Sequence, residues 1–462
     1  MKKTAVIAIF DVGKTNKKLL LFDEDYNVVF ETGNPLEETT DEDGFACENV
    51  HALTAWVKES FDVVINDERF DVKAVNFSGY GASFVYIGSV GDAIAPLYNY
   101  LKPFPEALKQ QFYTAYGGET VLSKQTSSPV LGNLNSGMQL YRLKYEQPEK
   151  FNAIRYALHL PQYLSYVLTK QVATDITSIG CHTNLWHFQF NKYHAWVHKE
   201  EIDKKFNAII PCTDTIGFNY NEITYRAGFG LHDSSAALIP YLAAFKEPFM
   251  LLSTGTWCIT LNPFNHSQLS DYELYQDCLC YLTYEGKPVK ASRLFAGYEH
   301  EEQVKRLAKH FDKPVNYYTT VNLDEQILNN IAVAKKKAQV NYKVMVQQSA
   351  FTTRDLNEFA DYETAYHQLI ADIMQQQIHA TKLVLGATVI KSLFVDGGFS
   401  KNKIYMHLLS KAFPNIKIYA ATVAQASALG AAMAIHNSWN KKQIPANIID
   451  IKLYSLPDLA QA

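Results

Sequence analysis

Two short apolar segments flank a small polar turn at the start of the chain. Residues 5–10 and 19–22 are almost entirely apolar, and the residues between them are polar and include Gly13. Short apolar runs bounded by turn residues are typical of β-strands. The pattern predicts a β-hairpin over residues 4–22.

The same pattern occurs once more near the middle of the chain. Residues 249–252 are apolar, residues 253–256 read Ser-Thr-Gly-Thr, and residues 257–261 are apolar and β-prone. A single glycine-containing turn between strands is most often only a turn. Two such hairpins, one opening each half of the chain, indicate two similar domains that face one nucleotide.

The rest of each half alternates between strand and helix patterns. The first half predicts strands at 28–32, 72–78 and 84–87, a helix at 50–65, and a mostly helical stretch over 98–187. The second half predicts further strands to residue 284, helices at 299–311 and 364–385, a strand at 392–395 and a helix carrying Met406. This order is typical of a layered α/β protein. Residues 424–435 predict a helix that packs against the glycine pair at 397 and 398.

Length and composition narrow the class of protein. The chain has 462 residues, which favours two domains, and we place them at 1–245 and 246–462. Its net charge of −4 argues against a nucleic-acid or anionic-membrane surface. The six cysteines follow neither zinc nor disulfide spacing, and no apolar run is long enough to span a bilayer. We therefore expect a cytoplasmic protein with reduced thiols.

The turn of the first hairpin is rich in groups that bind phosphate. Gly13 lets a ligand approach the backbone, Thr15 and Asn16 are short donors, and Lys14 and Lys18 carry positive charge. A P-loop is excluded because its first glycine would fall at Ala8, and because the segment runs into a strand and not into a helix.

Two further segments carry candidate chemistry. Glycines at 228 and 230 lead into a predicted helix that starts with His232 and Asp233. Asp233 is expected to cap this helix, to act as a carboxylate at the rim of a cleft, or to do both. Gly397 and Gly398 follow a strand and precede a helix, an arrangement that favours a wall for adenine or ribose.

These segments together resemble the FGGY family of carbohydrate kinases. The resemblance covers nearly the whole chain and rests on blocks in family order: DVGKTNKK at 11–18, GFGLHD at 228–233, LSTGTW at 252–257, DGGFSKN at 396–402 and the helix ASALGAA at 426–432. It implies an α/β fold of two ribonuclease-H-like (actin-like ATPase) domains with a cleft between them.

The resemblance also implies a reaction and the residues that perform it. The expected activity is ATP-dependent phosphorylation of a primary hydroxyl of a ketose or polyol, with Mg²⁺ as the metal. Asp233 is the expected general base, and Asp11 is expected to hold Mg²⁺ through water. Expected nucleotide and phosphate contacts are Gly13, Lys14, Thr15, Asn16, Lys18, Thr254, Gly255, Thr256, Gly397, Gly398 and Asn402. Expected substrate contacts are Gly81, Ser83, His232 and Asp233, and closure about residues 243–248 would exclude water.

The sugar is less well defined than the reaction. The His-Asp pair and the block at 252–257 resemble the rhamnulokinase and fuculokinase branch, so L-rhamnulose or L-fuculose is the favoured substrate. Lys14, Ser83, Gln425 and residues 98–102 depart from the family pattern, mostly in the sugar half. Xylulose and other sugars or polyols stay open, as do an actin- or chaperone-like ATPase and a catalytically silent relative. The expected partners are the sugar and ATP, with no nucleic acid and no membrane, and a homodimer is left open.

Overall fold

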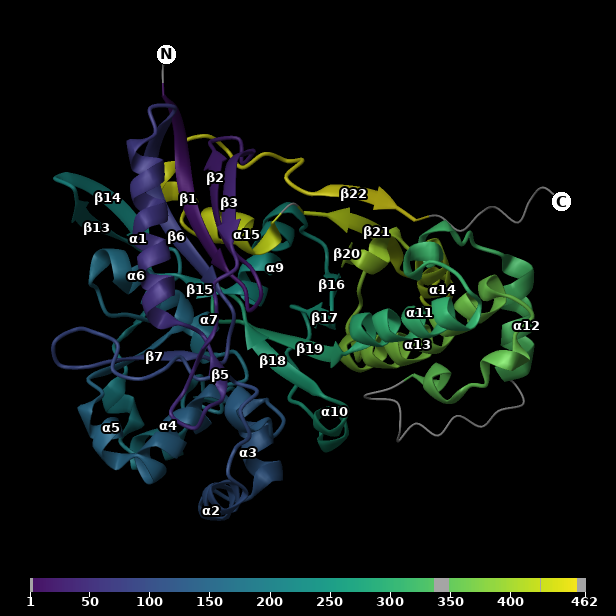
Figure 1. Ribbon diagram of the computed structural model, residues 1–462, viewed down its shortest axis with the longest axis horizontal. Helices are drawn as coiled ribbons and strands as arrows, with labels where there is room; N and C mark the ends of the chain where they lie inside the picture. The colour runs from purple at the N-terminus through teal and green to yellow at the C-terminus, as the bar shows by residue number, and fades with distance from the viewer. Residues whose placement is uncertain (1–2, 336–348, 424, 455–462) are drawn as a thin grey trace.

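The computed structural model describes residues 3–335, 349–423 and 425–454 and contains two lobes, each built on one large sheet. Figure 1 shows the lobe that begins the chain beside the lobe that carries α11 to α14. In the described ranges no helix is long and apolar enough to cross a membrane.

The first sheet contains the predicted hairpin at its centre. Strand β1 pairs antiparallel with β2, with Asp11 opposite Lys18, and pairs parallel with β6 on its other side. The sheet order is β13-β14-β6-β1-β2-β3, and β15 also pairs with β6. Its strands are β1 (Thr4–Val12), β2 (Lys17–Asp23), β3 (Val28–Asn34), β6 (Phe70–Gly79), β13 (Thr215–Tyr220), β14 (Ile223–Gly228) and β15 (Leu231–His232).

The second sheet repeats this arrangement and confirms the second hairpin. Strand β16 pairs antiparallel with β17 and parallel with β20, and β20 pairs parallel with β21. The sheet order is β18-β19-β17-β16-β20-β21-β22. Its strands are β16 (Phe249–Thr254), β17 (Cys258–Asn262), β18 (Cys278–Leu282), β19 (Pro288–Leu294), β20 (Ser392–Gly397), β21 (Lys417–Thr422) and β22 (Asp450–Leu453).

Helices cover the outer faces of both sheets. In the first lobe α1 (Val50–Asn66) and α6 (Leu160–Thr169) bury their apolar faces with β1 and β6 in one core. In the second lobe α11 (Ala296–His310), α13 (Tyr362–Leu385) and α14 (Lys403–Ala412) pack on the sheet, with α12 (Glu325–Lys335) against α13. The predicted helices at 50–65, 299–311 and 364–385 are therefore confirmed, with small shifts at their ends.

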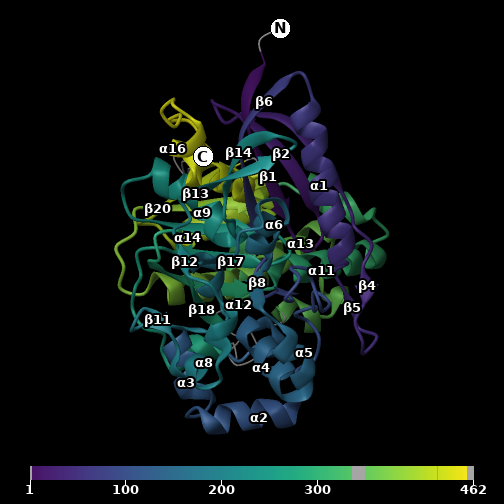
Figure 2. The ribbon, with the colours of Figure 1, turned by 90° about the vertical axis from the view of Figure 1, so that its left-hand side faces the viewer.

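The predicted helical stretch between the first-lobe strands is also confirmed, although short strands interrupt it. Most of its helices lie together below the first sheet in Figures 1 and 2. The helices are α2 (Glu106–Ala115), α3 (Glu119–Thr126), α4 (Ser136–Glu146), α5 (Pro148–Ala153), α7 (Ile176–Ile179) and α8 (Ala195–Lys199). Short strand pairs are β4 (Thr39–Thr40) with β5 (Ala46–Cys47), β7 (Phe84–Ile87) with β8 (Tyr156–His159), β9 (Thr174–Asp175) with β12 (Ile209–Ile210), and β10 (Trp186–His187) with β11 (Lys192–Tyr193).

Two helices lie between the lobes and correct one expectation. Helix α15 (Ala426–Ala434) packs against α9 (Asp233–Ala244), β1 and β6. We expected this helix to pack on the wall formed by Gly397 and Gly398, and that prediction is wrong. Gly430 explains the observed position, because a Cβ there would lie 1.8 Å from the Ala236 carbonyl oxygen of α9. The missing side chain lets the two helix backbones touch. Of the expected helix, residue 424 lies outside the described residues.

The chain continues on the first lobe after α15. Helix α16 (His436–Trp439) follows, and Tyr26 of the first lobe contacts the rings of both His436 and Trp439. The Asn440 side chain donates a 2.8 Å hydrogen bond to the Glu24 carbonyl oxygen. The C-terminal segment therefore ties the second lobe to the first before it returns as β22.

Candidate active site

Asp233 is the first residue of α9, at the boundary between the lobes. His232 occupies the N-cap position and its side chain makes no capping bond, so the expectation that Asp233 caps the helix is wrong. The Asp233 Oδ1 atom accepts hydrogen bonds from the backbone and side chain of Ser234. Burial nevertheless raises the pKa of Asp233 to about 6, against these hydrogen bonds. A carboxyl group with this pKa is ionised at neutral pH and is a stronger base than an exposed aspartate.

His232 holds one side of this carboxylate. Its Nε2 atom lies 3.2 Å from Asp233 Oδ1 and 3.0 Å from the Cys181 Sγ atom. Burial lowers the pKa of His232 to about 3, so the ring is neutral at pH 7. The Nε2 atom hydrogen-bonds to Cys181, and the neutral ring lies against Asp233 without lowering the basicity of the carboxylate as a positive charge would.

Asp11 is a second carboxylate of the same cleft. It lies one residue before the end of β1, opposite Lys18, and its Oδ2 atom accepts a 2.8 Å hydrogen bond from Ser427 of α15. Burial raises the pKa of Asp11 to about 6; hydrogen bonds from Ser427 and Ser78 oppose the rise, and the nearby Asp233 adds to it. The two carboxylates therefore influence each other's protonation.

A cavity of about 320 Å³ opens in front of Asp233. Its walls come from α9, from β16 and β17 of the second lobe, and from the start of α15. The lining residues are Asp233, Ser234, Ala237, Tyr241, Leu251, Ser253, Ile259, Leu261, Asp396, Gln425, Ala426 and Ser427. Burial also raises the pKa of Asp396. Carboxylates from both lobes thus face one space.

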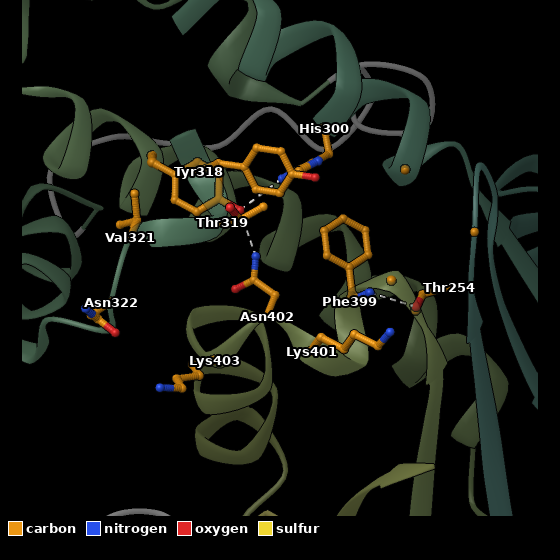
Figure 3. Close-up of a pocket in the computed structure, with 14 residues that line it drawn as sticks. Thr254, His300, Tyr318, Thr319, Val321, Asn322, Phe399, Lys401, Asn402 and Lys403 are labelled. Carbon is orange, nitrogen blue, oxygen red and sulfur yellow. Dashed lines mark hydrogen bonds between the residues drawn. The ribbon is translucent and has the colours of Figure 1, made fainter. Parts of the chain in front are cut away.

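A larger cavity of about 620 Å³ lies within the second lobe. Figure 3 shows its labelled side chains converging from α11, from the 3₁₀ helix η3 (Val315–Thr320) and from the segment before α14. The lining residues are Thr254, Gly255, Gly297, His300, Tyr318, Thr319, Val321, Asn322, Tyr366, Gly398, Phe399, Lys401, Asn402 and Lys403. Aromatic rings beside polar and cationic groups suit a nucleoside phosphate.

The expected residues of this cavity have clear structural roles. Thr254 Oγ1 accepts a 3.0 Å hydrogen bond from the Phe399 amide. Asn402 caps α14 through its side-chain oxygen, and its Nδ2 donates a 2.8 Å hydrogen bond to the Tyr366 hydroxyl (Figure 3). Gly397 has φ of +87°, and a Cβ there would lie 1.9 Å from the Thr254 carbonyl oxygen. Gly398 has no atom within 4 Å of an added Cβ, so its backbone is open to the cavity.

The ends of β16 and β20 separate the two cavities. On β16, Ser253 lines the smaller cavity and Thr254 the larger one; near the end of β20, Asp396 and Gly398 divide in the same way. Successive side chains of a strand point to opposite faces, which explains the division on β16; Gly398 lies beyond the end of β20, in the following 3₁₀ helix. The carboxyl ends of these two strands therefore lie between the larger cavity and the cavity that Asp233 lines.

The residues of the turn between β1 and β2 differ in their contacts and in their exposure. Lys14 forms ion pairs with Glu38 at 2.9 Å and Glu48 at 3.2 Å, whereas Lys18 pairs with Glu31 at 2.8 Å. The tip residues Thr15 and Asn16 are exposed, and Gly13 donates its amide to the Asn16 carbonyl oxygen. Thr256 and Gly255 in the matching turn of the second lobe are also exposed. The two lysines therefore differ in their surroundings. Two glutamates hold Lys14, whereas Lys18 lies opposite Asp11.

The two other expected substrate contacts lie differently. A Cβ on Gly81 would lie 2.9 Å from both Cys181 Sγ and His232 Nε2, so Gly81 adjoins the His232 side of the site. Ser83 is buried and is not among the residues that line either of these cavities.

Sequence reasoning did not single out several lining residues. Asp396 and Ser253 lie within blocks that were recognised, so their positions in alternating strands could have indicated them. His300, Tyr318 and Tyr366 come from separate helices and have no local signal, since ordinary core residues share their pattern. Ser427 becomes visible only when α15 is placed against β1.

The oxygen atoms around Asp11 suit a metal ion that is bound largely through water. In the described ranges no cluster of three or more histidine, cysteine, aspartate or glutamate side chains could enclose an ion. Asp11 and Ser427 nevertheless offer hard oxygen atoms next to Asp233, and Mg²⁺ commonly binds through one or two carboxylates and several waters. The residues therefore fit a water-mediated Mg²⁺ site better than an all-protein cage.

Known proteins share both the sequence pattern and the fold. The chain is 25% identical to a rhamnulokinase of Bacteroides thetaiotaomicron over 225 residues, which span 46% of this chain and 44% of that enzyme. A carbohydrate kinase from Novosphingobium aromaticivorans superposes with a TM-score of 0.80 at 21% identity, over 98% of this chain and 94% of that one. A ligand-bound xylulose kinase from Lactobacillus acidophilus gives 0.78 at 16%, over 97% and 93%.

These solved structures confirm the expected two-domain, actin-like ATPase fold. The model of the FGGY carbohydrate kinase N-terminal domain matches residues 6–199, and that of the C-terminal domain matches residues 246–443. Together the two matches cover most of the chain, which belongs to the FGGY family of carbohydrate kinases.

Proposed function

We propose that the protein transfers the γ-phosphoryl group of ATP to a primary hydroxyl of a ketose or polyol. The observation that carries this proposal is the position of Asp233 on one side of the β16 and β20 ends, with a nucleotide-sized cavity on the other. Family membership supports the same reaction.

Asp233 acts as the general base. Its carboxylate accepts the hydroxyl proton while the sugar oxygen bonds to the γ-phosphorus and the bond to the β-phosphate oxygen breaks, which releases ADP. Ser234 keeps the carboxylate oriented through its backbone and side-chain hydrogen bonds, and His232 packs beside it. Asp11 would hold Mg²⁺ through water, and the ion would neutralise charge on the phosphates. Lys18 and the amides of the turns at 13–18 and 254–256 stabilise the same charge.

Closure of the two domains completes the site. We place the boundary between them at residues 245 and 246, where α9 ends, and the hinge at residues 243–248. Closure brings the two hairpin turns toward the phosphates and excludes water. Transfer of the phosphoryl group to the sugar is thereby favoured over hydrolysis of ATP.

An L-deoxyketose such as L-rhamnulose or L-fuculose is the substrate that the observations favour. The His232-Asp233 pair and the similarity to a rhamnulokinase support it. Ser83 departs from the pattern of that branch, so a wider panel of sugars should be tested. We would measure coupled ADP release with Mg·ATP and L-rhamnulose, L-fuculose, D- and L-xylulose, D-ribulose, D-fructose and glycerol. One strong stimulant would support the proposal, and ADP release that no sugar alters would point to an ATPase.

The pH profile is expected to report the two carboxylates. Asp233 and Asp11 have pKa values raised to about 6, and each works in its ionised form. The kcat/KM for the sugar should therefore be constant above pH 7 and fall at least about tenfold per unit below pH 6. Initial rates between pH 5 and 8 would show this. A rate constant that stays flat down to pH 5 would contradict the assignment of these groups.

Lys18 and Lys14 form a matched pair of variants. Lys18→Ala should raise the KM for ATP about tenfold, because a charge-assisted contact with a phosphate is worth about 1.4 kcal/mol. Lys14→Ala should change it little, since Glu38 and the buried Glu48 both hold that ammonium group, whereas Lys18 has one exposed partner, Glu31, and lies opposite Asp11. Steady-state kinetics with varied ATP would decide. Equal effects of the two substitutions would contradict the proposal that Lys18 contacts the phosphates of ATP.

A further inference from the structure

A third cavity, of about 600 Å³, lies at the hinge and takes no part in the proposed reaction. The larger cavity of the second lobe, proposed above to hold the nucleotide and called here the nucleotide cavity, has a similar volume of about 620 Å³. The hinge cavity can therefore hold a molecule of similar size. The lining residues are Ala244, Phe245, Lys246, Glu247, Phe249, Lys391, Ser392, Phe394, Asn415, Lys417, Tyr419 and Ile451.

Three lysines give this cavity its charge. Lys246 precedes β16, Lys391 precedes β20, and Lys417 opens β21. The Lys391 amide bonds to the Pro248 carbonyl oxygen and the Lys417 amide to the Lys391 carbonyl oxygen, so the three strand starts are direct neighbours. Adjacent strands lie about 5 Å apart, so the three lysines enter the lining of one cavity from neighbouring strand starts.

Within the residues that the structure describes, no carboxylate forms an ion pair with Lys246, Lys391 or Lys417. Glu247 is the single acidic residue in the lining, so the cavity keeps a net positive charge. By contrast, lysines elsewhere, such as Lys290 and Lys102, are held by carboxylates.

The cavity floor is apolar and partly aromatic. Phe249, Phe394 and Tyr419 lie on one face of the sheet, because Phe249 is in register with Ser392, and Phe394 with Tyr419. Phe245 stacks on Phe394 with ring centroids 4.2 Å apart. Phe245 and Tyr419 are only partly buried, so their rings are open to an apolar part of a ligand.

We propose that this hinge cavity binds an organic phosphate, a phosphate monoester that carries a ring or other apolar part, and that the bound molecule regulates the enzyme. The lysines would hold the phosphate and the rings the rest of the molecule. The three lysines are exposed, and the cavity volume and aromatic floor beside them distinguish this site from a lysine cluster on a flat surface.

The position of the cavity supports a regulatory role. It lies at the C-terminal end of α9, whose first residue is Asp233, and at the amino ends of β16 and β20, whose carboxyl ends separate the active-site cavities. A ligand here would link residues 244–247 to the second sheet and so restrain both the hinge and α9. It can shift the domain equilibrium only if it binds the open and closed forms with different affinities.

Binding can be tested with phenyl phosphate and isothermal titration calorimetry on the full chain. We expect saturable binding that inorganic phosphate and benzyl alcohol do not match and that added salt weakens. The double substitution Lys391→Ala and Lys417→Ala should weaken it about tenfold or more. Lys452→Ala is the matched control, because Lys452 is exposed on β22 next to Ile451 and points to the opposite face.

Several results would contradict the proposed binding site. They are absence of saturable binding, equal affinity in the double variant, equal affinity for inorganic phosphate, and loss of binding in Lys401→Ala, which would place the probe in the nucleotide cavity. Because calorimetry needs no turnover, failure of the proposed kinase reaction would not affect this test.

The regulatory part has its own measurement. Phenyl phosphate should change kcat or the KM for ATP at least about twofold in the unaltered protein and in Lys452→Ala, but not in the double variant. Binding with unchanged kinetics in all three proteins would show that the site is not regulatory.

Discussion

Asp233→Asn is expected to lower kcat about 1,000-fold. Asparagine has nearly the same shape, but its amide cannot accept the hydroxyl proton, and a general base contributes about 100- to 10,000-fold to such reactions. The loss should be largest at pH 7 to 8, where the unaltered carboxylate, with its pKa of about 6, is ionised. Kinetics with saturating sugar and ATP would measure it.

The same variant contains its own control. The nucleotide cavity contains no part of α9, so ADP should bind Asp233→Asn with nearly unchanged affinity. The melting temperature should not fall, because the substitution removes a carboxylate that burial disfavours. Retention of most of the activity would show that another group accepts the proton. Loss of ADP binding or of folding would show that the kinetic effect is not specific to the chemistry.

Gly430→Ala is expected to destabilise the protein, against the intrinsic preference of helices. In an isolated helix this substitution is favourable by about 1 kcal/mol. Here the added Cβ would lie 1.8 Å from the Ala236 carbonyl oxygen, so α15 must move away from α9. Overpacking of this kind costs about 1–3 kcal/mol or more, and a backbone neighbour cannot rotate aside. The melting temperature should therefore fall by about 4 °C.

Activity should fall together with stability in this variant. Helix α15 carries Ser427, which donates to Asp11, so a displaced α15 disturbs the candidate Mg²⁺ site. Gly398→Ala is the matched control for stability, because no atom lies within 4 Å of its added Cβ. An unchanged or higher melting temperature for Gly430→Ala would mean that helix propensity outweighs the contact between α9 and α15.

Local patterns predicted much of the fold. Strands β1, β2, β16 and β17 were predicted from apolar runs around small polar turns, and the long helix α13 from its spacing. These features depend on neighbouring residues, which a sequence displays directly. The helix at 426–434 was also predicted, but its partner was not. Its position depends on a contact between Gly430 and Ala236, which are far apart in the chain.

The candidate site also contains some residues that the local sequence predicted and others that it did not. Asp11, Asp233, Thr254 and Gly398 could be selected because each lies at the end of a strand or at the start of a helix within a recognisable block. The roles of Lys14 and Lys18 could not be separated, since Glu38, Glu48 and Glu31 select between them only in the folded protein. Ser83 and the aromatic wall around Tyr318 likewise depend on packing that no local pattern encodes.

The most direct test of the account follows the phosphoryl group itself. The protein would be incubated with Mg·ATP labelled on the γ-phosphate and with the sugar that best stimulates ADP release, and the products would be separated. The account predicts that the label appears on the sugar in amounts equal to the ADP formed, and that Asp233→Asn nearly abolishes this transfer. Label found only in inorganic phosphate, at the same rate with and without sugar, would contradict it.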